Sequence, residues 1–158
     1  MCEARILLNE ENIPCDESYG QPLDITKIAR PHTPETNAAQ ATVEVPLIAL
    51  AWGRSGDKGN KANIGIIARK PEYLPYICDA LSEEVVSMRL AHFLADTGPG
   101  NVERFLLPGC NAINFLLHDV LGGGGVASIR NDPQAKGYSQ LLLSCPVSVP
   151  THIAEALA

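Results

Sequence analysis

One short segment of the chain holds most of the side chains that could bind or react. It runs from Gly53 to Asn63 between two apolar runs and combines three glycines with cations, a carboxylate, a hydroxyl and amides. Glycines let backbone N–H groups converge on an anion or a carbonyl oxygen, and Arg54 and Lys58 would add positive charge. A structural hairpin with a charged tip is the alternative interpretation. The candidate ligand-binding or interface residues are Arg54, Ser55, Gly56, Asp57, Lys58, Gly59, Asn60 and Asn63.

The spacing within this segment excludes the common nucleotide-binding loops. Lys58 follows an aspartate rather than a glycine, and no Ser or Thr comes after it, so the segment is not a Walker loop. A dinucleotide fingerprint would precede a helix, whereas a strand is expected after Asn60. Ser55 lacks the context of a nucleophile elbow. Asp57 beside Lys58 could act as an acid–base pair, but no residue is assigned as catalytic.

Later segments of the chain add four candidate site residues, and the histidines and cysteines predict no metal site. The run Gly122 to Gly125 contains four glycines, whereas one is enough to end a helix. The excess indicates that a ligand or another segment approaches this backbone closely. A flexible hinge is the alternative interpretation. The four histidines lack ligand spacing and the five cysteines form no CxxC pair, so neither a metal nor a cofactor is predicted. The further candidates for the binding or interface site are Asn114, Gly123, Gly124 and Arg130.

Composition limits the classes of protein to consider. A chain of 158 residues is the size of one domain. Its formal charge of −6 and pI near 5.1 argue against nucleic acid as a partner. No apolar run approaches the ~20 residues of a membrane span, and the N-terminus has no signal-peptide pattern. We therefore expect a cytoplasmic protein with reduced cysteines and no membrane partner.

The elements that must position these residues follow from apolar patterning. Residues 1–45 are rich in proline and read as an extended arm or linker, residues 46–150 as one domain, and residues 151–158 as a tail with at most two helical turns. Ser82 followed by two glutamates predicts a helix start, within a helical region that is one kinked helix or two. The expected order is strand 46–52, strand 63–69, helical region 72–95, strand 102–107, helix 111–121, strand 126–130 and strand 138–149. This order predicts an α+β sandwich with one mainly antiparallel sheet and helices on one face.

The motifs together resemble a known family. Leu50 to Asn60 with Ala62 to Arg69 is similar to the first block of the AtuA-like ferredoxin-fold domain, which occurs at the C-terminus of acyclic terpene utilisation proteins of the AtuA type or as a small separate protein. Asn114-Phe115, the glycines from Gly122, and later blocks at Ser128 to Asp132 and Lys136-Gly137 extend the resemblance. Asn131 and the fourth glycine depart from the pattern. The resemblance implies a ferredoxin-like sandwich with an additional strand, and an arm that is the end of a larger upstream domain or a tail in its place.

Three functions stay open. The first is an accessory domain or subunit of a catabolic system for acyl-CoA or carboxylic acids of the terpenoid type. It would bind a small carboxylate or a CoA thioester through the Arg54–Asn63 loop. For this function we expect Asp57, Lys58 and Arg130 to converge in one pocket. The second is a non-catalytic assembly module that forms a homo-oligomer or docks to a larger AtuA-type domain. The third is a small enzyme with His92 or His118 as its base.

Overall fold

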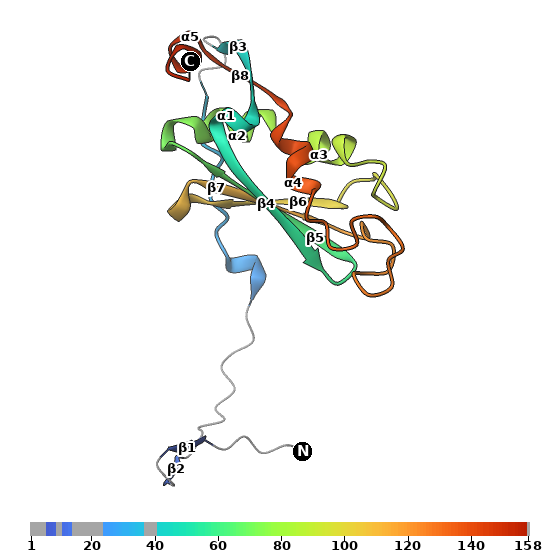
Figure 1. The fold of residues 1–158 in the computed structure, drawn as a ribbon. Helices are drawn as coiled ribbons and strands as arrows, with labels where there is room; N and C mark the ends of the chain where they lie inside the picture. The colour runs from blue at the N-terminus through green and yellow to red at the C-terminus, as the bar shows by residue number, and fades with distance from the viewer. Residues whose placement is uncertain (1–5, 9–10, 14–23, 37–40, 158) are drawn as a thin grey trace.

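The computed structural model describes residues 6–8, 11–13, 24–36 and 41–157. The remaining parts of the predicted arm, and the last residue of the tail, lie outside the described residues. The body is α+β, and its central sheet has four antiparallel strands in the order β4-β5-β7-β6 (Figure 1). These strands are β4 (Ala51–Lys58), β5 (Lys61–Ala68), β6 (Val102–Leu107) and β7 (Ala112–Leu117).

The sheet is built from two hairpins joined along their inner strands. β4 pairs with β5, β6 pairs with β7, and the β5–β7 pairing joins the two hairpins. Helices α2 (Leu74–Ala80) and α3 (Glu83–Arg89) connect the hairpins, and α4 (Tyr138–Leu143) follows the second. A ferredoxin-like chain runs β-α-β-β-α-β. With α2 and α3 taken together, the order here is β-β-α-β-β-α. This is the ferredoxin-like order shifted by one strand.

A second, two-stranded sheet forms the additional part of the sandwich. β3 (Ala41–Pro46) pairs antiparallel with β8 (Pro146–Pro150), with Val45 opposite Val147. The short helices α1 (Leu47–Leu50) and α5 (Thr151–Glu155) follow these strands. The structure also contains β1 (Ile6–Leu8) paired with β2 (Glu11–Ile13), and the 3-10 turns η1 (Ile25–Lys27), η3 (Pro71–Tyr73) and η4 (Pro108–Cys110).

The core lies between the four-stranded sheet and its helices. Side chains alternate between the two faces of a strand, and in β5 the buried positions are Ala62, Ile64, Ile66 and Ala68. Ile113, Phe115 and Leu117 of β7 are also buried. The helical region 72–95 is two helices, and Ser82 caps the second: its Oγ accepts the N–H of Val85 at 3.2 Å. The predicted helix start is confirmed.

Four expected elements are wrong. The predicted strand 46–52 is helix α1, because a short apolar run fits a buried helix as well as a strand, and the segment predicted as a loop from Gly53 is strand β4 as far as Lys58. The segment predicted as helix 111–121 is β7 and a turn, because its apolar residues also fit a period of two and both neighbouring strands pair with it. The predicted strand 126–130 is a loop with Val126 and Ile129 fully exposed. The predicted strand 138–149 is α4 followed by β8, and Pro146 begins the strand.

Within the described residues, no α-helix lies on the face of the four-stranded sheet that is turned away from α2, α3 and α4 (Figure 1). Described residues of the arm touch one edge of it: the Arg30 guanidinium lies 5.6 Å from the centre of the Phe105 ring on β6. In the described part of the chain, no helix is long and apolar enough to cross a membrane. The cysteines described there, Cys78, Cys110 and Cys145, form no disulfide.

Candidate functional site

The alternation of β4 divides the chemistry-rich segment between the two sides of the sheet. Ser55 and Asp57 point toward the helix side, and Ser55 is 4% exposed. Arg54, Gly56 and Lys58 point toward the opposite side. The segment therefore contributes to two separate regions. We call them the loop cluster, formed by Asp57, Gly59, Asn60 and residues 119–137, and the open sheet face, formed by the outward positions of β4, β5, β6 and β7.

Asn60 joins the two halves of the loop cluster. Its side-chain oxygen accepts the N–H of Gly123 at 2.7 Å, and its amide nitrogen donates to Asp119 Oδ1 at 2.9 Å. Its backbone oxygen accepts the N–H of Val120 at 3.1 Å. One side chain and its backbone thus fix the β4–β5 turn to the glycine-rich loop.

Gly124 shows why the glycine run is needed. Its φ is +97°, in the region that favours glycine, and a Cβ built on it would lie 3.1 Å from both the carbonyl carbon and oxygen of Gly59. The backbone of the glycine loop therefore rests directly on the backbone of the β4–β5 turn. The close approach expected from the sequence is present, and its partner is another segment of the chain.

Two charged residues of the loop cluster, Arg130 and Asp132, are bound to backbone groups. Arg130 donates through Nη1 to the carbonyl oxygens of Phe93 and Val120 at 2.7 and 2.9 Å. The Asp132 carboxylate accepts the N–H groups of Lys136 and Gly137 at 2.9 and 2.8 Å. These contacts hold the loop in one conformation, and they occupy groups that would otherwise face a ligand.

Ser55 anchors the start of α4 from beneath. Its Oγ donates to the carbonyl oxygen of Ala135 at 2.6 Å and accepts the N–H of Ser139 at 3.0 Å. Nearby, Tyr138 is buried, and its hydroxyl donates to Val120 O at 3.3 Å. Burial raises the pKa of the Tyr138 phenol, and the nearby Arg130 offsets part of that rise. The phenol is therefore held in its neutral form.

The open sheet face is ordered in rows that cross all four strands. The first row is apolar, and its register pairs place Trp52, Ile67, Ala112 and Leu107 side by side. Three of these large side chains remain exposed in spite of their apolar character: Trp52 by 54%, Ile67 by 45% and Leu107 by 43%. The second row holds Arg54, Gly65, Asn114 and Phe105, and the third holds Gly56, Asn63, Leu116 and Glu103.

Cations gather at the β4–β5 end of the open sheet face, beyond the apolar row. Lys58 and Lys61 are paired across the hairpin, and Arg54 lies further along β4. Lys136 joins them from the loop cluster, since its Nζ lies 3.3 Å from the position of a Cβ built on Gly56. Among the described residues none of these four cations forms an ion pair with a carboxylate. Lys58 Nζ donates a hydrogen bond to the carbonyl oxygen of Asp57, at 2.9 Å.

The structure thus separates the residues predicted from the sequence. Asp57, Gly59, Asn60, Gly123, Gly124 and Arg130 belong to the loop cluster, and Ser55 lies beneath it. Arg54, Gly56, Lys58, Asn63 and Asn114 lie on the open sheet face, where Asn63 Nδ2 donates to Asn114 Oδ1 at 3.2 Å. Lys58 is turned away from Asp57 and Arg130, so these three side chains have different surroundings. Lys136 and Trp52 were not among the predicted site residues: the strand register places Trp52, and the return of the loop after β7 brings Lys136 to Gly56.

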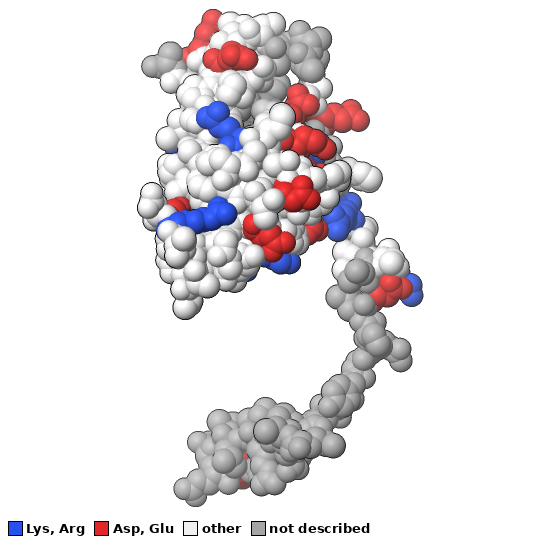
Figure 2. Space-filling model, turned by 90° about the vertical axis from the view of Figure 1, so that its right-hand side faces the viewer, with Lys and Arg blue, Asp and Glu red and all other residues white. Residues whose placement is uncertain are grey.

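The two histidines considered as bases have different partners. His118 Nε2 lies 2.7 Å from Glu103 Oε1, at the end of β7. The His92 ring lies against Phe93, with 4.0 Å between ring centres. No group of His, Cys, Asp or Glu side chains within the described ranges could hold a metal ion. Figure 2 shows acidic side chains gathered in a band on the side of the body from which the arm descends.

Comparison with known proteins agrees with this architecture. The model of the AtuA ferredoxin-like domain family matches residues 45–148, which include the four-stranded sheet, its helices and the loop cluster. No curated protein and no solved structure matches the chain.

Proposed function

Since the chain belongs to the AtuA ferredoxin-like domain family, we propose that it is a non-catalytic assembly module whose open sheet face docks onto a larger AtuA-type domain. The observation that carries this proposal is the exposed apolar row of Trp52, Ile67 and Leu107. Large apolar side chains that lie together on a protein surface mark contact sites for other proteins. An aromatic and two aliphatic side chains in one row would form the centre of such a contact.

Charge supports a partner other than a second copy. The chain carries a formal charge of −6, yet Arg54, Lys58, Lys61 and Lys136 gather on the same sheet face as the apolar row. Two copies packed through this face would bring the cations of both into one interface, where they would repel each other. The carboxylate in the third row, that of Glu103, already binds His118 and so would not offset this charge. A partner surface with an apolar strip flanked by carboxylates would complement both parts of the face.

The polar groups of the loop cluster argue against a catalytic centre there. Asn60, Arg130 and Asp132 bind backbone and side-chain groups of the chain itself. A residue that acts on a substrate must reach it within hydrogen-bond distance. These side chains instead support the shape of the domain, which is what an assembly module requires.

The test is the association of the full chain with a purified larger AtuA-type domain from the same organism, measured by sedimentation velocity. We expect a complex that the Trp52→Gln/Ile67→Gln variant weakens at least tenfold, because it removes the centre of the apolar row. Met88→Gln is the control, since Met88 is 72% exposed on α3, which lies on the other side of the sheet. Equal weakening by both variants, or no complex, would overturn the proposal. A homodimer broken by the same double substitution would assign the face to a second copy instead.

A second candidate function is favoured by Lys136. Its ammonium group lies over Gly56, where the strand has no side chain, with Arg54 and Lys58 on the same face. This arrangement supports the binding of a carboxylate or of the phosphates of a CoA thioester. Small ligands are usually bound in concave sites, and the sheet face is built from extended strands, so docking is preferred.

A titration of the ¹⁵N-labelled chain with inorganic phosphate, acetate and coenzyme A distinguishes anion binding from docking of a partner protein. Anion binding predicts saturable shifts of the Gly56 and Asn63 amide signals that Lys136→Met weakens and Lys70→Met does not. Lys70 is the control because it is exposed and lies near Glu72, at 3.9 Å, away from this face. Shifts that are alike in both variants would count against an anion site at Gly56.

A further inference from the structure

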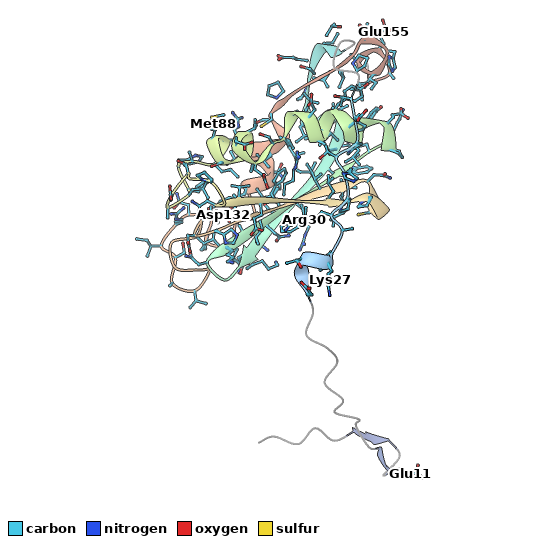
Figure 3. The ribbon with its side chains drawn as sticks, turned by 180° about the vertical axis from the view of Figure 1, so that it is seen from behind. Glu11, Lys27, Arg30, Met88, Asp132 and Glu155 are labelled. Atoms are coloured by element: carbon cyan, nitrogen blue, oxygen red, sulfur yellow. The ribbon has the colours of Figure 1, made fainter. Side chains whose placement is uncertain are left out.

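Two aromatic side chains lie in the rows of the open sheet face, and each has an arginine over its ring. The Arg69 guanidinium lies 4.6 Å from the centre of the Trp52 ring. The Arg30 guanidinium lies 5.6 Å from the centre of the Phe105 ring. Arg30 belongs to the part of the arm that passes beside the sheet, with Lys27 further away on η1 (Figure 3). Arg69 instead comes directly after β5, so the Trp52 pair is built within the body of the domain.

Arg69 is held by two hydrogen bonds to the segment that precedes Trp52. Its backbone N–H donates to the carbonyl oxygen of Leu50 at 2.8 Å. Its Nε donates to the carbonyl oxygen of Ile48 at 3.1 Å. A side chain that is fixed both at its main chain and at Nε has few ways to place its guanidinium. The Trp52 ring therefore has a cation in a fixed position over it.

These contacts leave most donors of the Arg69 guanidinium free. The group has five N–H donors, and the bond to Ile48 uses one of them. Within the described residues, Arg69 forms no ion pair with a carboxylate. Lys70, the next residue, differs, because its Nζ lies 3.9 Å from Glu72 Oε1. A guanidinium that lies over a ring can still bind a carboxylate in its own plane, through two parallel hydrogen bonds.

The position of Arg69 restricts which partner surface can cover Trp52. Because the guanidinium lies over the ring, a partner that buries Trp52 also takes water away from Arg69. A charge that is buried without a counter-charge opposes binding strongly. A carboxylate placed on the guanidinium removes this penalty, and the contact between cation and ring also strengthens when water is excluded. The partner must therefore bring a carboxylate to this point.

We propose that Trp52 and Arg69 form one subsite of the docking face, which receives an aspartate or glutamate side chain of the partner beside an apolar side chain. The carboxylate binds the Nη groups of Arg69, and the apolar side chain packs on Trp52 and Ile67. Arg69 also positions the ring, which lowers the rotamer freedom that Trp52 loses on docking. This inference rests on the proposed docking of a larger AtuA-type domain. It places a carboxylate of that domain on the side of the apolar row that is away from Arg54.

The first test measures docking to the purified larger AtuA-type domain by sedimentation velocity. We expect Arg69→Gln to weaken the complex about tenfold. Arg69→Lys keeps the charge but loses the planar group with its paired donors, so it should restore only a small part of the affinity. Lys70→Gln is the matched control, because it removes the same charge one residue further on, from a side chain that already lies near Glu72. Its affinity should stay within about twofold of the unmodified chain.

A double-mutant cycle identifies the carboxylate. Each surface aspartate or glutamate of the partner is replaced by asparagine or glutamine, and each variant is measured against the unmodified chain and against Arg69→Gln. One partner substitution should weaken docking of the unmodified chain and have little further effect on Arg69→Gln, because the two groups act as a pair. Additive losses for every partner carboxylate would overturn the assignment of the ligand.

Fluorescence tests the positioning role in the free chain, because Trp52 is the only tryptophan of the sequence. Arg69→Gln removes the group that lies over the ring, so acrylamide should quench the emission more strongly and the anisotropy of Trp52 should fall. Lys70→Gln should leave both values unchanged. Unchanged quenching in Arg69→Gln would show that Arg69 does not hold the ring.

The outcomes distinguish this subsite from the docking face as a whole. A complex that Trp52→Gln/Ile67→Gln weakens and Arg69→Gln does not would overturn the subsite and leave the docking face in place. Full rescue by Arg69→Lys, or equal weakening by Lys70→Gln, would also overturn it, since any positive charge would then serve. The absence of a complex would overturn both proposals.

Discussion

In the loop cluster, Asn60, Arg130 and Asp132 each bind groups of the same chain, and Gly124 lies on the backbone of Gly59. On the open sheet face, Trp52 and Ile67 stay exposed and the neighbouring cations form no ion pair among the described residues. Both regions contain residues of the one segment Gly53–Asn63. Successive residues of a strand point to opposite faces, so one segment can stabilise the fold with half of its residues and meet a partner with the other half.

The largest expected effect tests whether the loop cluster is as tightly fitted as its contacts indicate. Gly124→Ala places a Cβ 3.1 Å from the Gly59 backbone at a φ of +97°. We expect a loss of about 3 kcal/mol in the free energy of unfolding, from backbone strain and overpacking together. Urea denaturation followed by circular dichroism measures it.

Gly65→Ala is the matched substitution on the open sheet face. A Cβ there would meet its nearest atom, the Arg54 carbonyl oxygen, at 3.8 Å, which is ordinary contact. Its effect should stay within about 0.5 kcal/mol. Similar losses in the two variants would remove the distinction between the regions.

A smaller effect tests the hydrogen bonds beneath the loop cluster. Ser55→Ala leaves the N–H of Ser139 and the carbonyl oxygen of Ala135 without their shared hydroxyl. Buried groups that lose a partner in this way cost about 2 kcal/mol. Thermal unfolding should show the loss, whereas Ser148→Ala, at an exposed position of β8, should leave stability unchanged. A loss of equal size at Ser148 would show that the cost is not specific to the buried hydroxyl.

The smallest expected effect depends on pH. The pKa of the Tyr138 phenol is raised in the folded chain, so its contribution to stability is complete below its usual value of 10.0 and is lost as pH rises through the higher folded value. Burial also raises the pKa values of the Cys78 and Cys145 thiols, which extends the loss to slightly lower pH. The melting temperature should therefore fall in alkaline buffer, and less steeply in Tyr138→Phe. An unchanged slope in that variant would assign the alkaline loss to the thiols.

The sequence predicted the fold class, the strand that follows Asn60 and the helix start at Ser82, and the structure confirms them. The strand expected at 46–52 is instead helix α1, and β4 occupies the segment expected to be a loop. Residues 111–121 fit two periods at once, and the choice between helix and strand depends on β5 and β6, which lie far away in the sequence. Long-range pairing of this kind overrides local preference.

The site was predicted as a set of residues but not as an arrangement. The composition of Gly53–Asn63 predicted which residues could bind a ligand or a partner, and the strand register separates Lys58 from Asp57. Lys136 was not predicted as part of the site, because its closeness to Gly56 depends on how the loop after β7 returns to β4.

The pairing of β3 with β8 has a consequence for how the domain can be carried by other chains. Ala41 lies opposite Pro150, so the two ends of the folded body leave it side by side. A domain closed in this way can be placed within a surface loop of a host protein, or joined end to end and reopened elsewhere, without separating its sheets. Among the sheet pairings of the described residues, β3 with β8 also spans the greatest sequence separation, so its formation has the largest loop-closure entropy cost.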